Sequence, residues 1–170
     1  MSDRIDDRTR FWILACPPIF LFHEAEEYRT ALSWISNHAS LVPNAVRSVL
    51  PTGPAFIGIA GLIFLVVFVI AGTIALRSRP QSVAWIVFAI LLLARLENAI
   101  LHIIESIVVM QYTPGVLTAV LVVLPLSFYL IKQLLQLDLI RKQWMFAIVG
   151  AGFIAQTASI GAMLLIGSVS

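Results

Sequence analysis

Residues 11–35 read FWILACPPIFLFHEAEEYRTALSWI, an apolar run that holds His23, three glutamates and Arg29 around and beyond its middle. A helix that crosses a membrane needs about 20 mostly apolar residues, and this run is long enough. Ionisable side chains are costly in hydrocarbon, so those that occur there usually face the interior of a bundle and mark a functional site. Residues 11–35 therefore predict a transmembrane helix whose polar stretch faces a site.

The composition of the whole chain supports a membrane protein. The 170 residues are 60% hydrophobic and 12% charged, whereas soluble domains carry about 25% charged residues. This length suits one membrane domain over 1–170. The net charge of +2 is small and its basic residues are scattered, so we expect no nucleic-acid partner. The lone cysteine, Cys16, excludes an internal disulfide framework.

Five segments are long and apolar enough to cross the bilayer, and they predict an all-α polytopic bundle of five transmembrane helices. The segments are 11–35, 55–76, 83–110, 114–135 and 144–166. With five crossings, eight of the eleven Lys and Arg residues fall near one side of the membrane. Because basic residues concentrate in cytoplasmic loops, we expect the N-terminus inside and the C-terminus outside. We expect the protein in a bacterial inner (plasma) membrane.

Two features of the connections and helices bear on the site. The connection 36–53 predicts either a short interfacial helix or a lid over the site. Proline removes a backbone donor, so Pro17 and Pro18 should kink the first helix before His23, and Pro125 should kink the segment 114–135.

Depth along the first and third helices predicts that their polar residues meet. At about 1.5 Å per residue, His23 lies ~18 Å along 11–35, and Arg95 lies ~18 Å along 83–110. His102 follows at ~28 Å. Since both helices are expected to start inside, both polar sets fall in the outer half of the bilayer.

Helical spacing groups these side chains on two faces. On 11–35, positions i, i+3 and i+4 hold His23, Glu26 and Glu27. On 83–110 a narrow polar stripe consists of four residues, Arg95, Asn98, His102 and Glu105. Glu97 points away from this stripe and needs a partner that the pattern does not name.

The same residues resemble a known family. The stretch His23-Glu24-Ala25-Glu26-Glu27 is similar to the His-x-x-Glu-Glu signature of the HXXEE family of small bacterial membrane proteins. The resemblance continues with Asn98 and His102, with Tyr112-Thr113-Pro114-Gly115, and with Pro125 in the following apolar segment. It runs from the first to the fourth helix. It supports these positions as a site and implies no particular reaction.

We expect an enzyme that acts on a hydrophobic small molecule or lipid, of isoprenoid or sterol type. Crowded carboxylates in a low dielectric keep some protons, and a histidine beside them can act as a base. The predicted catalytic residues are His23, Glu26, Glu27, Asn98, His102 and Glu105. The predicted substrate-binding residues are Glu24, Arg95 and Tyr112.

A metal site is an alternative interpretation of this cluster. His and Glu one turn apart on two helices resemble the way that helical bundles hold metal ions. The ligands would be His23, Glu27, His102 and Glu105, and such nitrogen and oxygen donors suit Zn, Fe or Mn. The protein would then be a metal-dependent enzyme or a metal-binding protein.

A second alternative is a small proton-coupled transporter, because intramembrane His and Glu also form proton relays. A homodimer could serve this function. The predicted polar residues, however, stop in the outer half of the bilayer, and a cavity closed at one end favours an enzyme over a conduit. The bilayer and a lipophilic small molecule are the predicted partners.

Overall fold

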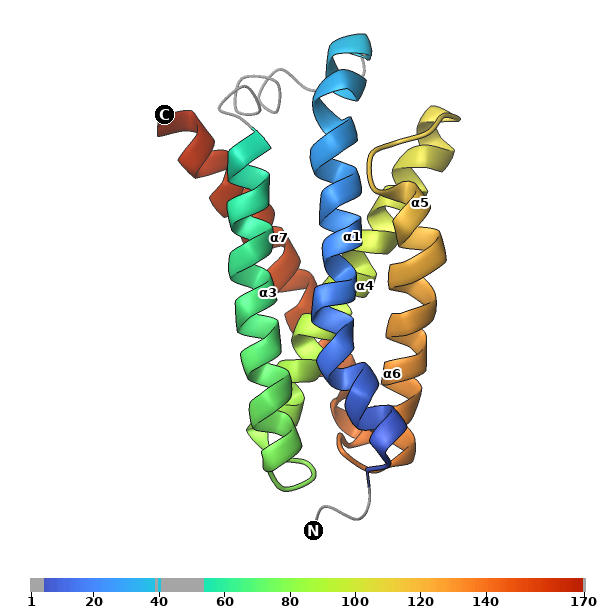
Figure 1. Ribbon diagram of the computed structural model, residues 1–170, viewed down its shortest axis with the longest axis vertical. Coiled ribbons are helices and arrows are strands. Elements are labelled where there is room, and N and C mark those ends of the chain that lie inside the picture. Colours follow the sequence, from blue (N-terminus) through green and yellow to red (C-terminus); the bar gives the residue numbers. More distant parts are fainter. Residues whose placement is uncertain (1–4, 39, 41–53, 170) are drawn as a thin grey trace.

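The computed structural model describes residues 5–38, 40 and 54–169, with side chains described over 5–38, 40 and 61–158. Within these ranges every regular element is helical, which confirms the all-α class (Figure 1). The elements are α1 (Asp7–Asn37), α3 (Pro54–Arg77), α4 (Val83–Val109), α5 (Val116–Thr118), the π-helical turn η3 (Ala119–Val123), α6 (Leu124–Gln136), the 3-10 turn η4 (Lys142–Trp144) and α7 (Met145–Val169).

The helix ends follow local capping and proline chemistry. α1 begins earlier than predicted because the Asp6 carboxylate accepts a hydrogen bond from the Thr9 backbone N–H at 2.8 Å. The predicted helix 114–135 is divided into α5, η3 and α6, with the π-helical turn ending just before Pro125.

The connection 36–53 was predicted to form either an interfacial helix or a lid. Both interpretations depend on residues 41–53, which lie outside the described residues.

α1 passes through its two prolines as one continuous helix. Pro17 has no N–H to donate to the Ile13 carbonyl, and the Cys16 thiol donates to that carbonyl instead, at 3.5 Å. The ribbon of α1 changes direction in its first half, as a proline kink would make it (blue, Figure 1). The prolines therefore bend α1 without ending it.

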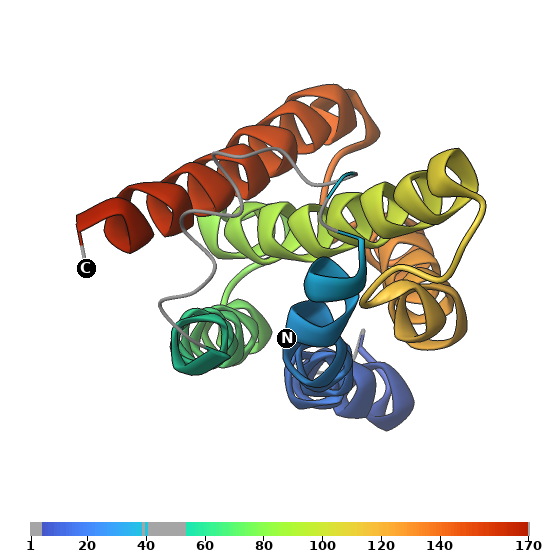
Figure 2. The same cartoon turned by 90° about the horizontal axis from the view of Figure 1, so that it is seen from above.

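The long helices run alternately up and down, so α1 begins and α7 ends at opposite ends of the bundle (Figure 1). Seen from above, α3, α1 and α6 lie on one side of α4, and α7 lies on the other (Figure 2). α4 packs against α3, α6 and α7. It is thus the central helix, and side chains on its different faces meet different neighbours.

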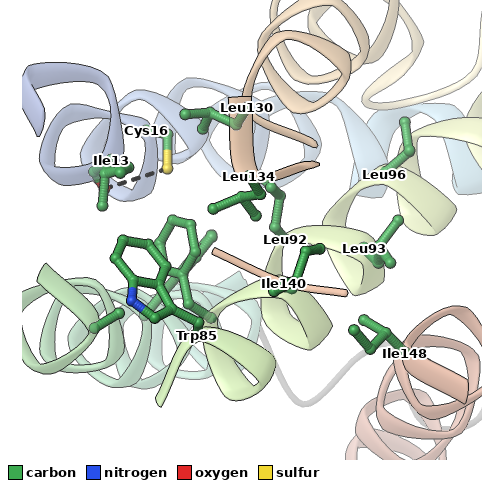
Figure 3. Close-up of a cluster of buried hydrophobic side chains, with 14 of the residues drawn as sticks. Ile13, Cys16, Trp85, Leu92, Leu93, Leu96, Leu130, Leu134, Ile140 and Ile148 are labelled. Atoms are coloured by element: carbon green, nitrogen blue, oxygen red, sulfur yellow. Dashed lines mark hydrogen bonds between the residues drawn. The ribbon is translucent and has the colours of Figure 1, made fainter. Parts of the chain in front are cut away.

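The apolar core occupies the end of the bundle where α1 begins. Close-packed side chains from α1, α3, α4, α6 and α7 fill this end, including Ile13, Cys16, Phe68, Trp85, Phe88, Leu92, Leu130, Leu134 and Ile148 (Figure 3). Phe88 contacts both Phe68 and Trp85, with ring centroids 5.1 and 6.2 Å apart. The polar side chains of α1 and α4 lie beyond this core, toward the other end of the bundle.

Two helical stretches in the described residues are long and apolar enough to cross a membrane, Val83–Val109 and Val116–Gln136. The part of α3 with described side chains, Gly61–Arg77, forms a shorter apolar helix. The five crossings and the orientation of the two termini stay predictions.

Candidate functional site

Four polar side chains from α1 and α4 converge above the apolar core. We call His23, Glu27, Asn98 and His102 the central cluster. His23 is only 1% exposed, and its Nε2 lies 3.6 Å from the Glu27 carboxylate. The same carboxylate oxygen contacts His102 Nε2. One ligand atom from each of these three side chains lies within 4.8 Å of the other two, which is close enough to share one ion.

Asn98 orients both imidazoles. Its Nδ2 lies 3.0 Å from His23 Nε2 and 3.2 Å from His102 Nε2, while its Oδ1 accepts a hydrogen bond from Gln156 Nε2 at 2.6 Å. An amide N–H donates only to an imidazole nitrogen that carries no proton. The amide can therefore donate to His23 Nε2, and to His102 Nε2 when that nitrogen does not hold the proton shared with Glu27.

A threonine hydroxyl sets the tautomer of His23. Thr118 Oγ1 donates to Glu26 at 2.5 Å and lies 3.0 Å from His23 Nδ1. Because the Thr118 hydroxyl gives its proton to Glu26, its oxygen accepts a hydrogen bond from His23 Nδ1–H. The neutral His23 ring then carries no proton on Nε2. Glu26 is held in turn by the backbone N–H groups of Thr118 and Leu117, at 2.7 and 3.2 Å.

Tyr112 completes the surroundings of Glu26. Its hydroxyl donates to the Glu26 carboxylate at 2.7 Å. Burial raises the pKa of this phenol above its ordinary value, so the group stays protonated at neutral pH and keeps donating. The Tyr112 carbonyl also accepts from Trp34 Nε1 at 2.6 Å, which ties the connection before α5 to the end of α1.

Gly115 brings this connection directly over the central cluster. It has a φ of 85°, in the left-handed region that favours glycine. A Cβ atom here would lie 2.9 Å from His23 Cε1, 3.1 Å from Glu27 Cγ and 3.2 Å from His102 Cε1. Glycine is therefore needed for both its backbone conformation and its lack of a side chain.

The other predicted residues lie around the cluster. Glu24 forms an ion pair with Arg95, whose guanidinium lies 3.7 Å from the centroid of the Phe64 ring. Glu105 is 61% exposed, with a carboxylate oxygen 3.7 Å from His102 Nδ1, so it lies at the rim. Glu97, for which the sequence pattern named no partner, lies near α7, where a Cβ on Gly152 would lie 3.4 Å from its Oε1.

The structure thus brings together His23, Glu27, Asn98 and His102, and it joins Glu26 and Tyr112 to them through Thr118. Their roles in binding or catalysis stay predictions. Sequence reasoning missed Thr118 and Gln156. Each is a polar side chain in an otherwise apolar helical segment, and that was the available signal.

A family model described as "Protein of unknown function with HXXEE motif" matches residues 14–130. The chain belongs to the HXXEE family. The matched region contains the whole central cluster together with Thr118, and Gln156 lies outside it. No curated protein and no solved structure matches the chain.

The three residues that name the HXXEE motif have different positions in the site. His23 and Glu27 belong to the central cluster, one helical turn apart, so both reach the same point. Glu26 points toward the start of α5 and acts on His23 through Thr118. The motif therefore combines two residues of the cluster with one that orients it.

Proposed function

We propose that this HXXEE protein is a membrane-embedded, metal-dependent enzyme acting on a lipophilic small molecule. The observation that carries the proposal is the convergence of His23 Nε2, His102 Nε2 and the Glu27 carboxylate within 4.8 Å. Two imidazoles and one carboxylate suit Zn, Fe or Mn. Three protein ligands leave a coordination position for water or substrate, which is typical of catalytic metal sites.

The contacts of His23 support a metal ligand further. Metal-bound histidines usually donate their second N–H to an oxygen, which fixes the tautomer and orients the ring. The chain from His23 Nδ1 through Thr118 to Glu26 is such an arrangement. A bound cation would also offset the cost of burying the Glu27 carboxylate.

A second candidate is acid–base catalysis without a metal, and the contact between Glu27 and His102 favours it. His102 Nε2 faces both a carboxylate acceptor and the Asn98 donor, so a proton can be held on either side of the pair. Such a pair could protonate and deprotonate a lipophilic substrate.

For the membrane arrangement we propose five crossings of a bacterial plasma membrane, with the N-terminus inside and the C-terminus outside. The alternating directions of the long helices and the two long apolar stretches support this topology. It places the central cluster in the outer half of the bilayer, where the substrate is a lipid-soluble molecule.

Elemental analysis of protein purified in mild detergent tests the metal. We expect about one equivalent of Zn, Fe or Mn, lost in the double variant His23→Ala/His102→Ala. His38→Ala is the matched control, because His38 stacks on Trp34 outside the cluster and should keep the metal. Wild-type protein that folds and carries no stoichiometric metal after growth with each ion would contradict the metal proposal and favour acid–base catalysis.

A further inference from the structure

An apolar groove runs along the seam between α1 and the segment formed by η3 and α6. It has a volume of about 400 Å³ and is lined by Arg8, Trp12, Ile19, Leu121, Val122, Pro125, Leu126 and Tyr129. Ligand pockets of small molecules typically have volumes of about 300–1,000 Å³. Its lining has one charged side chain, Arg8.

The groove ends one helical turn short of the central cluster. Ile19 lies one helical turn before His23 on the same face of α1, and Leu121 and Val122 lie one turn after Thr118. One end of the groove therefore lies about one helical turn from the hydrogen bond between His23 and Thr118. A molecule in the groove would extend toward the metal-binding atoms.

The other end of the groove carries aromatic rings and a positive charge. Trp12 and Tyr129 contact edge to face, with centroids 6.4 Å apart, and the Arg8 guanidinium lies 5.9 Å from the Tyr129 centroid. Arginine at the end of a transmembrane helix keeps its charge in water while its stem covers apolar surface. From Arg8 to His23 the helix rises ~22 Å, the reach of a long hydrocarbon chain.

We propose that this groove binds the substrate's hydrocarbon chain and that the substrate is a single-chain lipid with a carboxylate head group paired with Arg8. This inference rests on the proposed function and names its substrate class. One guanidinium can pair with one carboxylate, and Arg8 is the one charged side chain in the lining of the groove. The far part of the chain then points toward His23 and Thr118.

Binding of a fluorescent long-chain fatty acid to the purified full-length protein tests the groove. Leu121→Trp should fill the groove and weaken binding at least tenfold. Val120→Trp is the matched control, because Val120 is the neighbouring exposed residue and does not line the groove, so binding should persist. Equal binding by wild type and both variants would overturn the inference.

The head group is tested with Arg8→Gln and with three competitors of equal chain length. Because Arg8 is exposed and water competes for its charge, Arg8→Gln should weaken displacement by the fatty acid roughly two- to fivefold. The same substitution, Arg8→Gln, should leave displacement by the uncharged methyl ester unchanged. Tighter displacement by the alkyl phosphate than by the carboxylate, or no effect of Arg8→Gln, would overturn the carboxylate assignment.

The two proposals can fail separately when metal content is measured in the same samples. Leu121→Trp should keep its metal while losing the fatty acid. A wild-type protein that holds metal and binds no fatty acid would contradict the groove alone. A protein that binds the fatty acid in the groove without any metal would contradict the metal centre alone.

Discussion

At the scale of single residues, the hydroxyl of Thr118 links two members of the HXXEE motif. It accepts from His23 Nδ1 and donates to Glu26. Because neither contact comes from sequence neighbours, the orientation of His23 depends on how closely α5 approaches α1. The hydroxyl can be removed with little change in side-chain volume, which makes its contribution measurable.

Thr118→Val should weaken metal binding about 10–100-fold, the range measured for residues that orient metal ligands. The variant loses the acceptor that holds the proton on Nδ1, so Nε2 no longer presents its lone pair in a fixed direction. Titration with Zn²⁺ measures the change, and Thr118→Ser should restore affinity.

Thr157→Val serves as the control for Thr118→Val. The Thr157 hydroxyl is exposed and donates to the Phe153 carbonyl within α7, away from the cluster. Similar affinities for Thr118→Val and wild type would contradict an orienting role for Thr118.

Gly115→Ala should both destabilise the protein and reduce metal binding. A left-handed conformation costs a non-glycine residue roughly 1–2 kcal/mol, and the added Cβ would lie 2.9 Å from His23 Cε1. The melting temperature and the metal content measure the two effects.

Met110→Gly changes a second left-handed position, one that does not contact the cluster. Met110 also has a left-handed backbone, with φ 52°, but its side chain is 89% exposed. Its metal content should match wild type. Normal metal content in Gly115→Ala would show that the cluster tolerates a side chain above it.

At the scale of elements, α1 is held in place by a buried segment around its prolines. The Cys16 side chain is 0% exposed and donates to Ile13, at the point where Pro17 leaves a carbonyl without its helical donor. The thiol is therefore a reporter of whether α1 is packed.

A membrane-permeable maleimide should label Cys16 slowly in folded protein and rapidly after unfolding, because the thiol is buried only while α1 is packed. Mass spectrometry measures the extent of labelling, which is unambiguous because the chain has one cysteine. Wild-type protein unfolded in SDS gives the maximum extent. Fast labelling under native conditions would mean that the α1 packing opens readily.

The pairing of α4 with α7 depends on a small residue. A Cβ on Gly152 would lie 3.2 Å from both the Ala94 backbone nitrogen and Leu93 Cβ. Glycines at such positions let two helices approach closely in a membrane. Gln156, which orients Asn98, follows one turn later on α7.

Gly152→Val should therefore cost about 1–3 kcal/mol of stability, as overpacked interiors do. It should also weaken metal binding, because α7 would move Gln156 away from Asn98. Unfolding in a graded series of SDS concentrations measures stability. Gly150→Val is the control, since nothing lies within 4 Å of a Cβ there; equal losses in both variants would contradict a specific α4–α7 contact.

At the scale of the whole molecule, the apolar core and the central cluster lie at different heights in the bundle. The core gathers where α1 begins, and the central cluster lies beyond it toward the other end. Because α1 begins and α7 ends at opposite ends of the bundle, a membrane around it would leave the two termini on opposite sides.

Reporter fusions test this topology. Alkaline phosphatase fused after residue 170 should be active in a bacterial host, and green fluorescent protein fused there should be dark, because the C-terminus is expected outside. The same reporters before residue 1 should give the reverse result. Termini on the same side would contradict five crossings.

Much of this arrangement follows from the amino-acid pattern. Apolar segments of membrane length predicted helices close to the observed ones, and spacings of three and four residues predicted the faces that carry His23, Glu27, Asn98 and His102. These features are local, because helical geometry alone decides which side chains share a face. The family resemblance is confirmed by the match over 14–130.

The remaining features depend on how the helices pack. Glu105 shares the stripe of His102 but lies at the exposed rim, because α1 faces only part of α4. Thr118, Gly115 and Gln156 reach the cluster from segments distant in the sequence, and no local period predicts such contacts. The sequence by itself determined the helices and their polar faces. Only the tertiary structure decided which polar side chains meet, because that depends on the approach of α5 and α7 to α1 and α4.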